Sequence, residues 1–412
     1  MPGPFDLAEM NRRLSALQHL PNPYPINLDS PPDEVLRRIF RYIQADSASS
    51  SSPQSQFVIA SVTRRWREVA IKIPSLWTTI RISHDRQMAV LRDIVHRSLN
   101  QPLKIYIRLE AFRYRFFTEY LEAVDILIPH VAQWHTFSVT ATNPVLHLIS
   151  KRLHLLPMPM LERFELVQCD SGHIQHFGPF VFSPAAFRFL RLERTMMYAE
   201  DAPQLKGLEY IELKESSLAM LDEHKLLSID YPSLESRTPS MGALRCLILD
   251  GSNPVTDRGL PYSPAFVPVH ITTLSFARLT APSMDRVQAL SRFFGTALSA
   301  PALRSLAIED IHGYALTMLL SVIRAQAGKK TVTRFPTLER LALVGIETTG
   351  IDDKFMSAFN GGMEELVLAR LDAEPILKRL GVQRELWPAL RRIELDGEVV
   401  SREGAAQYGG EC

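Results

Sequence analysis

The most constraining feature of this sequence is a short apolar pattern that recurs from residue 134 to the C-terminal region. The pattern is apolar-x-x-apolar-x-apolar, and nine copies begin at Trp134, Leu161, Leu208, Leu244, Ile271, Leu303, Leu338, Met363 and Leu390. The alternation at the end of each copy predicts a short strand that directs its last two apolar side chains to one face. Because one such strand cannot bury that face alone, the copies must stack on one another in a shared core.

Successive copies begin 25 to 47 residues apart. This spacing brackets the period of about 20 to 29 residues that is typical of leucine-rich repeats, which the array resembles, with several longer insertions. Helical patterns at 284–298, 314–326 and 351–359 lie between copies and would form an outer layer. The predicted fold class is therefore α/β: a short all-helical module followed by an irregular leucine-rich-repeat solenoid of parallel strands backed by outer helices.

The other face of the predicted strands is the candidate surface for a protein target. Strand side chains alternate, so the residues between the inward apolar positions point to the concave side of the array. Charged residues gather at both ends of this surface, and its middle is small or apolar. The candidate target-binding residues are Arg163, Glu165, Tyr210, Glu212, Ile248, Arg340, Glu365, Arg392 and Glu394. For any single residue a solvated strand face is the simpler interpretation, and only the whole array favours binding.

Upstream of the array, a helix start is predicted near residue 30. Ser30 can cap a helix, Pro31 suits its first position, and Asp33 completes a capping-box arrangement. The apolar residues that follow at helical spacing are Val35, Leu36, Ile39, Phe40 and Ile43. A second helix is predicted over Ile59, Val62, Trp66 and Val69, which are three or four residues apart. Two such amphipathic helices are more often a packed pair than a docking site.

The residue identities in this region resemble the F-box, in the form common in mushroom-type fungi. The resemblance rests on Pro32-x-Glu34-Val35-Leu36-x-x-Ile39-Phe40, Val62-x-Arg64-Arg65-Trp66-Arg67-x-Val69-Ala70 and Pro74-Ser75-Leu76-Trp77-x-x-Ile80. Residues 91–105 also look like the segment that commonly follows the fungal F-box. The resemblance implies a three-helix module that binds a Skp-type adaptor and, through it, a cullin-based ubiquitin ligase. Carried over by position, it implies adaptor contacts at Leu28, Pro32, Val35, Leu36, Ile39, Phe40, Val62, Arg65, Trp66, Leu76 and Trp77.

One position departs from the F-box pattern. The family usually has Leu-Pro where this chain has Pro31-Pro32, so the first apolar anchor is either missing or replaced by Leu28. The resemblance therefore depends more heavily on Val62, Arg65 and Trp66 in the second half of the module.

Charge and cysteine usage restrict the partners and the compartment. The 46 basic and 45 acidic residues leave a formal net charge of +1, so no overall field favours nucleic acid or an anionic membrane. Cys169, Cys246 and Cys412 form no CxxC pair, which indicates neither a disulfide framework nor a cysteine-rich zinc site. No apolar run approaches the roughly 18 residues that a membrane-spanning helix needs, and no signal peptide is recognisable. A cytoplasmic or nuclear protein is expected.

Motifs for catalysis are not found in the sequence. Cys169, His173 and His176 offer metal-ligand types, but the fourth ligand and the spacing of a zinc finger are missing. Cys169 is better explained as the position three residues after Leu166, where leucine-rich repeats carry Asn or Cys that bonds the turn backbone. The sequence contains no Gly-x-Ser-x-Gly, P-loop, GxGxxG or HExxH motif. No catalytic residue, metal or cofactor is predicted.

These patterns predict four segments. Residues 1–22 form an amphipathic helix, 23–82 an F-box-like adaptor-binding domain with a Ser-rich insertion at 45–56, 83–396 the repeat domain, and 397–412 a flexible tail. Within the repeat domain, a helix is expected at 84–99, a strand at 102–109 and a helix at 116–128.

Three functions compete on this organisation. The first is a substrate-recognition subunit that binds the adaptor through the F-box and an unknown protein target through the repeats. The second is a repeat scaffold without a ubiquitin-ligase role. The third is a hydrolase or metalloenzyme built on the repeats, which has no motif in its favour and would depend on His173 or His176.

Overall fold

The computed structural model describes residues 31–47, 55–83, 90–109, 117–170, 176–177, 181–183, 185–197, 207–216, 243–251, 270–279, 294, 298, 300–327, 335–359, 362–383, 385–401 and 404. The chain divides into two compact units, Met1–Trp77 and Thr78–Cys412. The predicted N-terminal helix, Leu28, most of the Ser-rich insertion and most of the helix at 284–298 lie outside the described residues.

The described part of the first unit is helical. Its elements are α2 (Asp33–Ser47), α3 (Ser55–Val62), α4 (Arg64–Ile71) and the 3-10 helix η1 (Pro74–Trp77). Helix α2 begins at Asp33 rather than at Pro31, and the Pro32 carbonyl accepts the first helical hydrogen bond, 3.1 Å from the Leu36 amide nitrogen. The predicted helix through Ile59 and Val69 is wrong in one respect, because it is two helices that meet at Thr63.

Thr63 separates α3 from α4 by acting as a helix N-cap. Its backbone is extended, with φ −143° and ψ 167°, and its hydroxyl accepts a hydrogen bond from the Trp66 amide at 3.1 Å. A β-branched residue that can satisfy an orphan amide favours the start of a new helix over continuation of the old one. The apolar spacing alone did not distinguish this break from one continuous helix.

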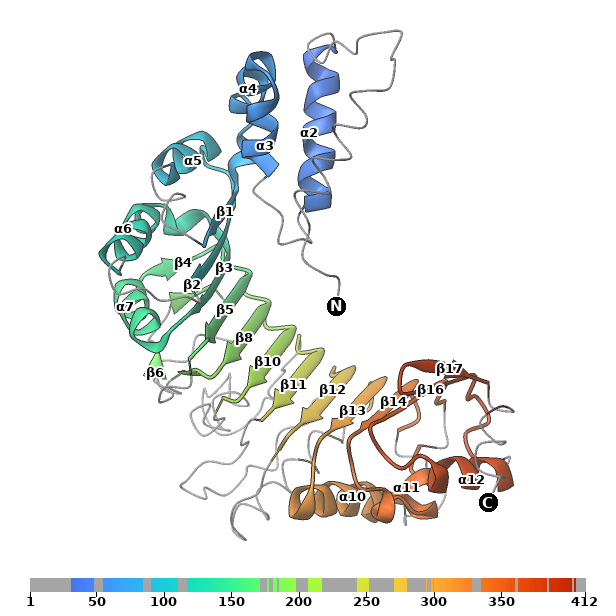
Figure 1. Cartoon of the computed structure of the whole chain (residues 1–412). Helices are drawn as coiled ribbons and strands as arrows, with labels where there is room; N and C mark the ends of the chain where they lie inside the picture. The colour runs from blue at the N-terminus through green and yellow to red at the C-terminus, as the bar shows by residue number, and fades with distance from the viewer. Residues whose placement is uncertain are drawn as a thin grey trace. The chain divides into compact units, whose positions relative to one another are not determined.

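The second unit is built on a sheet of 13 strands in which neighbours follow the chain order (Figure 1). The strands are β1 (Thr79–Ile82), β2 (Leu103–Leu109), β3 (Trp134–Ala141), β5 (Arg163–Gln168), β8 (Phe189–Glu193), β10 (Tyr210–Lys214), β11 (Cys246–Asp250), β12 (Thr273–Ala277), β13 (Ser305–Glu309), β14 (Arg340–Val344), β15 (Glu365–Ala369), β16 (Arg392–Leu395) and β17 (Glu398–Val400). All neighbours are parallel except β16 and β17. Two small sheets pair β4 (Pro157–Met158) with β7 (Val181–Phe182) and β6 (His176–Phe177) with β9 (Met196–Met197).

The nine predicted strands are all present, as is the strand expected at 102–109. Strand β8 was missed, although Phe187-x-x-Leu190-x-Leu192 matches the same pattern and divides the longest interval between copies. Residues 79–82, which were grouped with the F-box-like segment, form β1 of the second unit, and residues 398–400 of the expected tail form β17.

Aligned rows of apolar side chains make the core of the second unit. The parallel register places the middle apolar residue of each copy beside its counterpart, as in Leu274, Leu306 and Leu341. These three side chains have no exposed surface. Two other inward apolar residues, Leu247 and Leu395, are only half-buried. Continuous burial of this kind requires neighbours on both sides, as expected of a stacked array.

Helices connect many of the strands. They are α5 (Leu91–Ser98), α6 (Phe117–Leu127), η4 (Ile128–Gln133), α7 (Asn143–Leu153), α10 (Gly313–Ala327), η7 (Thr348–Gly350), α11 (Asp353–Ser357) and α12 (Glu374–Val382). Figure 1 shows α5 to α7 beside the first strands of the sheet and α10 to α12 beside the last ones. The helices predicted at 84–99, 116–128, 314–326 and 351–359 correspond to α5, α6, α10 and α11. Of the first of these, residues 84–89 lie outside the described residues.

A row of left-handed residues follows the strands from β8 to β16. Each residue directly after its strand has φ between 47° and 62°: Arg194, Glu215, Gly251, Arg278, Asp310, Gly345, Arg370 and Asp396. Most of their amides donate to a carbonyl at the end of an adjacent strand, such as Asp310 to Val344 at 2.8 Å and Gly345 to Ala369 at 2.8 Å. Only two of these residues are glycine, so the other positions accept a backbone conformation that usually costs about 1 kcal/mol or more.

The side chains of this row link strands that are not adjacent. The Asp310 carboxylate passes over Gly345 to reach Arg370, with 3.0 Å between the paired atoms. Glu215 passes over Gly251 to Arg278 at 3.6 Å in the same way, and it also pairs with Arg194. A Cβ atom at Gly345 would overlap the Asp310 carboxylate. Glycine is therefore needed there for space as well as for its left-handed backbone.

Candidate functional site

The first candidate surface consists of two apolar stripes on the helices of the first unit. Val35, Ile39 and Tyr42 recur at i, i+4 and i+7 on α2, and are 43 %, 37 % and 78 % exposed. Val58 and Val62 form a shorter stripe on α3, 49 % and 40 % exposed. Residues at this spacing lie on one side of a helix. Exposed apolar side chains gathered in this way mark surfaces that bind another protein.

The helix spacing did not separate contact residues from core residues. Of the predicted adaptor-binding residues, Leu36, Phe40, Leu76 and Trp77 are buried inside the unit. The exposed ones are Pro32, Val35, Ile39 and Val62, and the half-buried ones are Arg65 and Trp66. The apolar arc of α2 is wide enough that one half packs inward while the other faces outward. Tyr42 and Val58 extend the exposed stripes and were not predicted.

Buried and half-buried residues hold the stripes in place. The Phe40 and Trp66 rings are 5.1 Å apart between centroids, which packs α2 against α4. The Arg65 guanidinium pairs with Asp33 at 3.1 Å, also between these helices. The Trp77 indole donates to the Ala70 carbonyl at 3.0 Å, which anchors η1. These contacts pack α2 and η1 against α4, so that the stripes lie on a folded helical unit.

Helix α2 carries charges of both signs, with Asp33, Glu34 and Asp46 against Arg37, Arg38 and Arg41. Arg37, Arg38 and Arg41 are exposed on this helix, whereas its first-turn acids are Asp33 and Glu34. Arg64 and Arg67 are exposed on α4. The α2 charges sum to zero and Arg64 pairs with Glu68 at 3.1 Å, so the helix charges indicate no preference for the charge of a partner.

The second candidate surface is the side-chain face of the sheet opposite the buried rows. The parallel register aligns the predicted target-binding residues in two rows. The first row contains Arg163, Tyr210, Arg340, Glu365 and Arg392, and the second contains Glu165, Glu212, Ile248 and Glu394. The missed strand β8 adds Phe189 to the first row and Arg191 to the second. The pattern of Phe187, Leu190 and Leu192 was the signal that could have identified them.

A stack of planar groups crosses β5, β8 and β10. The Arg163 guanidinium carbon lies 3.5 Å from the centroid of the Phe189 ring. The Phe189 and Tyr210 rings are 4.3 Å apart and 9° from parallel. The Tyr210 hydroxyl donates to Glu212 at 2.9 Å. Burial, followed by the hydrogen bond to the Glu212 carboxylate and its charge, raises the pKa of Tyr210.

Two acids in the row next to this stack, Glu165 and Glu212, are only 8 % exposed and are paired with neighbouring side chains. Glu165 pairs with Arg163 and accepts from the Ser138 hydroxyl at 2.7 Å. Glu212 pairs with Lys214 at 3.1 Å and with Arg191 at 3.6 Å. Because buried charges are tolerated when they are paired, this network supports the sheet face.

The other end of the sheet face carries a smaller charged network. Glu365 lies 3.5 Å from both Arg340 and Arg392, and Arg392 also pairs with Glu394 at 3.3 Å. Between the two networks, both rows are uncharged on β11, β12 and β13: Cys246, Ile248, Thr273, Ser275, Ser305 and Ala307. Burial and the Glu212 charge raise the pKa of Cys246 to about 11.

No metal centre is found among the described residues, in which no group of three or more His, Cys, Asp and Glu side chains could hold an ion. His173 and the side chain of His176 lie outside the described residues. The Cys169 amide donates to the Ala141 carbonyl at 3.0 Å. At the equivalent places after β8 and β10, the hydroxyls of Thr195 and Ser216 donate to the carbonyls of Leu166 and Leu192 at 3.5 and 3.3 Å. The residues at this position, Cys169, Thr195 and Ser216, therefore hydrogen-bond the backbone of other strands and support the turns that follow β5, β8 and β10.

The fold and its surfaces define a mixed α/β protein with an open, mostly parallel 13-strand sheet and a separate helical unit. None of the helices in the described ranges is long and apolar enough to cross a membrane. Neither models of known protein families nor curated protein sequences match the chain.

Proposed function

We propose that this protein is the substrate-recognition subunit of a Skp-cullin-F-box ubiquitin ligase. The first unit binds the adaptor, and the sheet face of the second unit binds a protein target. The protein contributes proximity and orientation to ubiquitin transfer, whereas the reactive groups belong to other subunits. Its residence in the cytoplasm or nucleus follows from this role.

The observation that carries the proposal is the exposure of the apolar stripes on α2 and α3 in a unit with its own core. Val35, Ile39 and Val62 come from the F-box resemblance and are the members of that set that a partner can reach. Leu36, Phe40, Leu76 and Trp77 support them from inside. Apolar anchors at the centre of an interface supply most of its binding energy.

The direct test is co-expression with a fungal Skp-type adaptor, followed by affinity capture and sizing. Ile39→Asp and Val62→Asp place a charge in the proposed interface, and each should reduce adaptor capture by at least about tenfold. Ile71→Asp is the matched control, because Ile71 is 40 % exposed on α4, outside both stripes. Full adaptor capture by both interface variants would refute this role for the stripes, and failure of the unaltered chain to capture the adaptor would refute the ligase role.

A repeat scaffold without a ligase role is the second candidate. The two aligned rows of the sheet face support it, since they would serve a partner equally well without an adaptor. Under this alternative, the chain captures a target protein while the adaptor elutes as a separate species. Charge reversal at Arg392, which is exposed on β16, should then weaken target capture without altering adaptor behaviour.

A further inference from the structure

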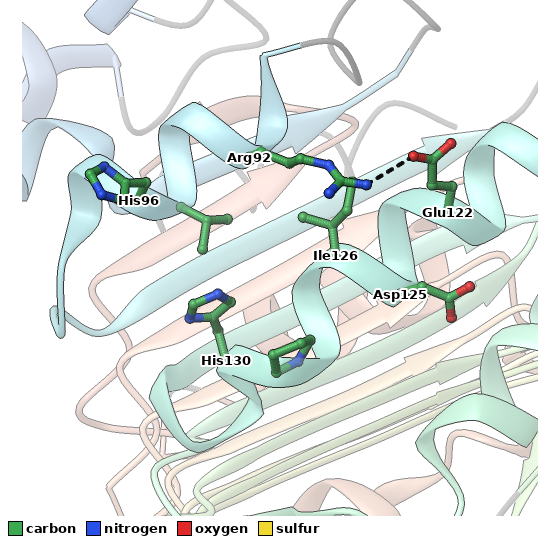
Figure 2. Close-up of a pocket in the computed structure, with 8 residues that line it drawn as sticks. Arg92, His96, Glu122, Asp125, Ile126 and His130 are labelled. Atoms are coloured by element: carbon green, nitrogen blue, oxygen red, sulfur yellow. Dashed lines mark hydrogen bonds and ion pairs between the residues drawn. The ribbon is translucent and has the colours of Figure 1, made fainter.

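A pocket of about 410 Å³ lies in the helical layer of the second unit, between α5 on one side and α6 with η4 on the other (Figure 2). This volume is within the range of small-molecule sites. Its apolar part comes from Val95, which is 3 % exposed, together with Ile126 and Pro129. Neither the candidate sheet face nor the helical stripes of the first unit contribute a residue to it.

Both acids that line the pocket are paired with arginines. Arg92 pairs with Glu122 at 3.2 Å across the pocket. Asp125 pairs with Arg152 of α7 at 2.7 Å. Both carboxylates are therefore neutralised, and a cationic ligand would have to displace a guanidinium to reach either one.

Two histidines are the uncommitted polar groups of the pocket. His96 follows Arg92 by one helical turn on α5, and His130 lies on η4. Within the described part of the chain, neither imidazole has a hydrogen-bond or ion-pair partner. Figure 2 shows both rings on the side of the pocket away from Glu122 and Asp125, with Arg92 between His96 and Glu122.

This arrangement favours an anion with an apolar body. Arg92, His96 and His130 can all donate hydrogen bonds to an acidic group, and hydrogen bonds between charged partners are the strong ones. The separation from Glu122 and Asp125 reduces repulsion of such a group. Val95 and Ile126 would cover the apolar remainder of the ligand, which water solvates poorly.

We propose that this pocket binds a small molecule that carries a phosphoryl or carboxylate group on an apolar body, with the acidic group held by His96, His130 and Arg92. Each imidazole can donate one N–H to the acidic group, and the Arg92 guanidinium adds further donors beside them. The site does not depend on the ubiquitin-ligase role.

The test uses calorimetric titration of the full chain with phenyl phosphate and with benzoate, which share a ring and differ in the acidic group. Saturable binding of either probe supports the proposal and identifies the acidic group. His96→Gln and His130→Gln should each weaken the binding about tenfold or more, since each removes a charge-assisted donor. His154→Gln, at the exposed end of α7, is the matched control and should bind as the unaltered chain does.

A second measurement does not depend on the histidine variants. Glu122→Gln removes a negative charge from the pocket and should tighten benzoate binding. The proposal is overturned if neither probe binds saturably at millimolar concentration, if both histidine variants bind like the unaltered chain, or if Glu122→Gln weakens binding.

Discussion

Alanine in place of Gly345 should destabilise the sheet more than alanine at another left-handed glycine. Gly345 has φ +60°, and Gly313, which begins α10, has φ +56°. A Cβ atom at Gly345 would overlap the Asp310 carboxylate, whereas a Cβ atom at Gly313 would meet nothing within 4 Å. The two substitutions therefore share the cost of a left-handed alanine and differ in whether they displace Asp310.

The magnitudes follow from this difference. A left-handed alanine costs about 1 kcal/mol, which is the whole effect expected for Gly313→Ala. At Gly345 the displaced carboxylate also loses Arg370, and a pair this exposed, with side chains 27 % and 57 % accessible, is worth at most about 1 kcal/mol. Gly345→Ala should therefore lower the free energy of unfolding by about 2 kcal/mol. Asp310→Ala added to it should cost little more, because the overlap is then relieved.

The assay is native-state hydrogen exchange at residue 345, whose amide donates to the Ala369 carbonyl, supported by urea unfolding. Urea unfolding of the second unit compares all the variants on one scale, and exchange at residue 345 localises the effect to β14 and β15. Equal destabilisation by Gly345→Ala and Gly313→Ala would refute the role assigned to the Asp310 side chain. Full additivity of Asp310→Ala with Gly345→Ala would refute it as well.

Four further outcomes are expected. Leu341→Ala should cost about 2 to 5 kcal/mol in urea unfolding, because this side chain is fully buried. Thr63→Ala removes the cap of α4 and should cost about 1 kcal/mol of the first unit's stability, with Thr63→Ser close to the unaltered chain. The raised pKa of Cys246, about 11, predicts slow alkylation at pH 8 in the folded protein and rapid alkylation in urea. The hydrogen bond from Arg194, opposed by burial, lowers the pKa of Glu215, so its contribution to stability is present above the unfolded value and is lost as the pH falls through the folded one. Acid unfolding of Glu215→Gln should therefore show a weaker pH dependence below about pH 5.

Much of the strand content was predictable because it depends on local order. A copy such as Leu303, Leu306 and Ile308 identifies its own strand from period-two alternation, and the same signal at Phe187 was present but overlooked. The break at Thr63 was not predictable from spacing, because α3 and α4 continue the same apolar rhythm. Only the extended backbone of Thr63 shows that one helix ends and another begins.

The candidate surfaces were predictable as sets of residues but not as accessible groups. The spacing places Val35, Leu36, Ile39 and Phe40 on one apolar arc, yet only packing against α4 and η1 determines that Leu36 and Phe40 are covered while Val35 and Ile39 are not. No sequence pattern indicated the pocket at His96 and His130, because the residues that line it become neighbours only when α5 packs beside α6.

By itself, the sequence determined that this chain forms a stacked α/β array, since nine short strands with one apolar face each have no other way to bury it. It also determined which side chains lie on the opposite face of the sheet, because alternation is a property of the strand backbone. The tertiary structure alone decided which charges meet. Asp310 and Arg370 are 60 residues apart and pair across Gly345 only because parallel register brings the ends of three strands together.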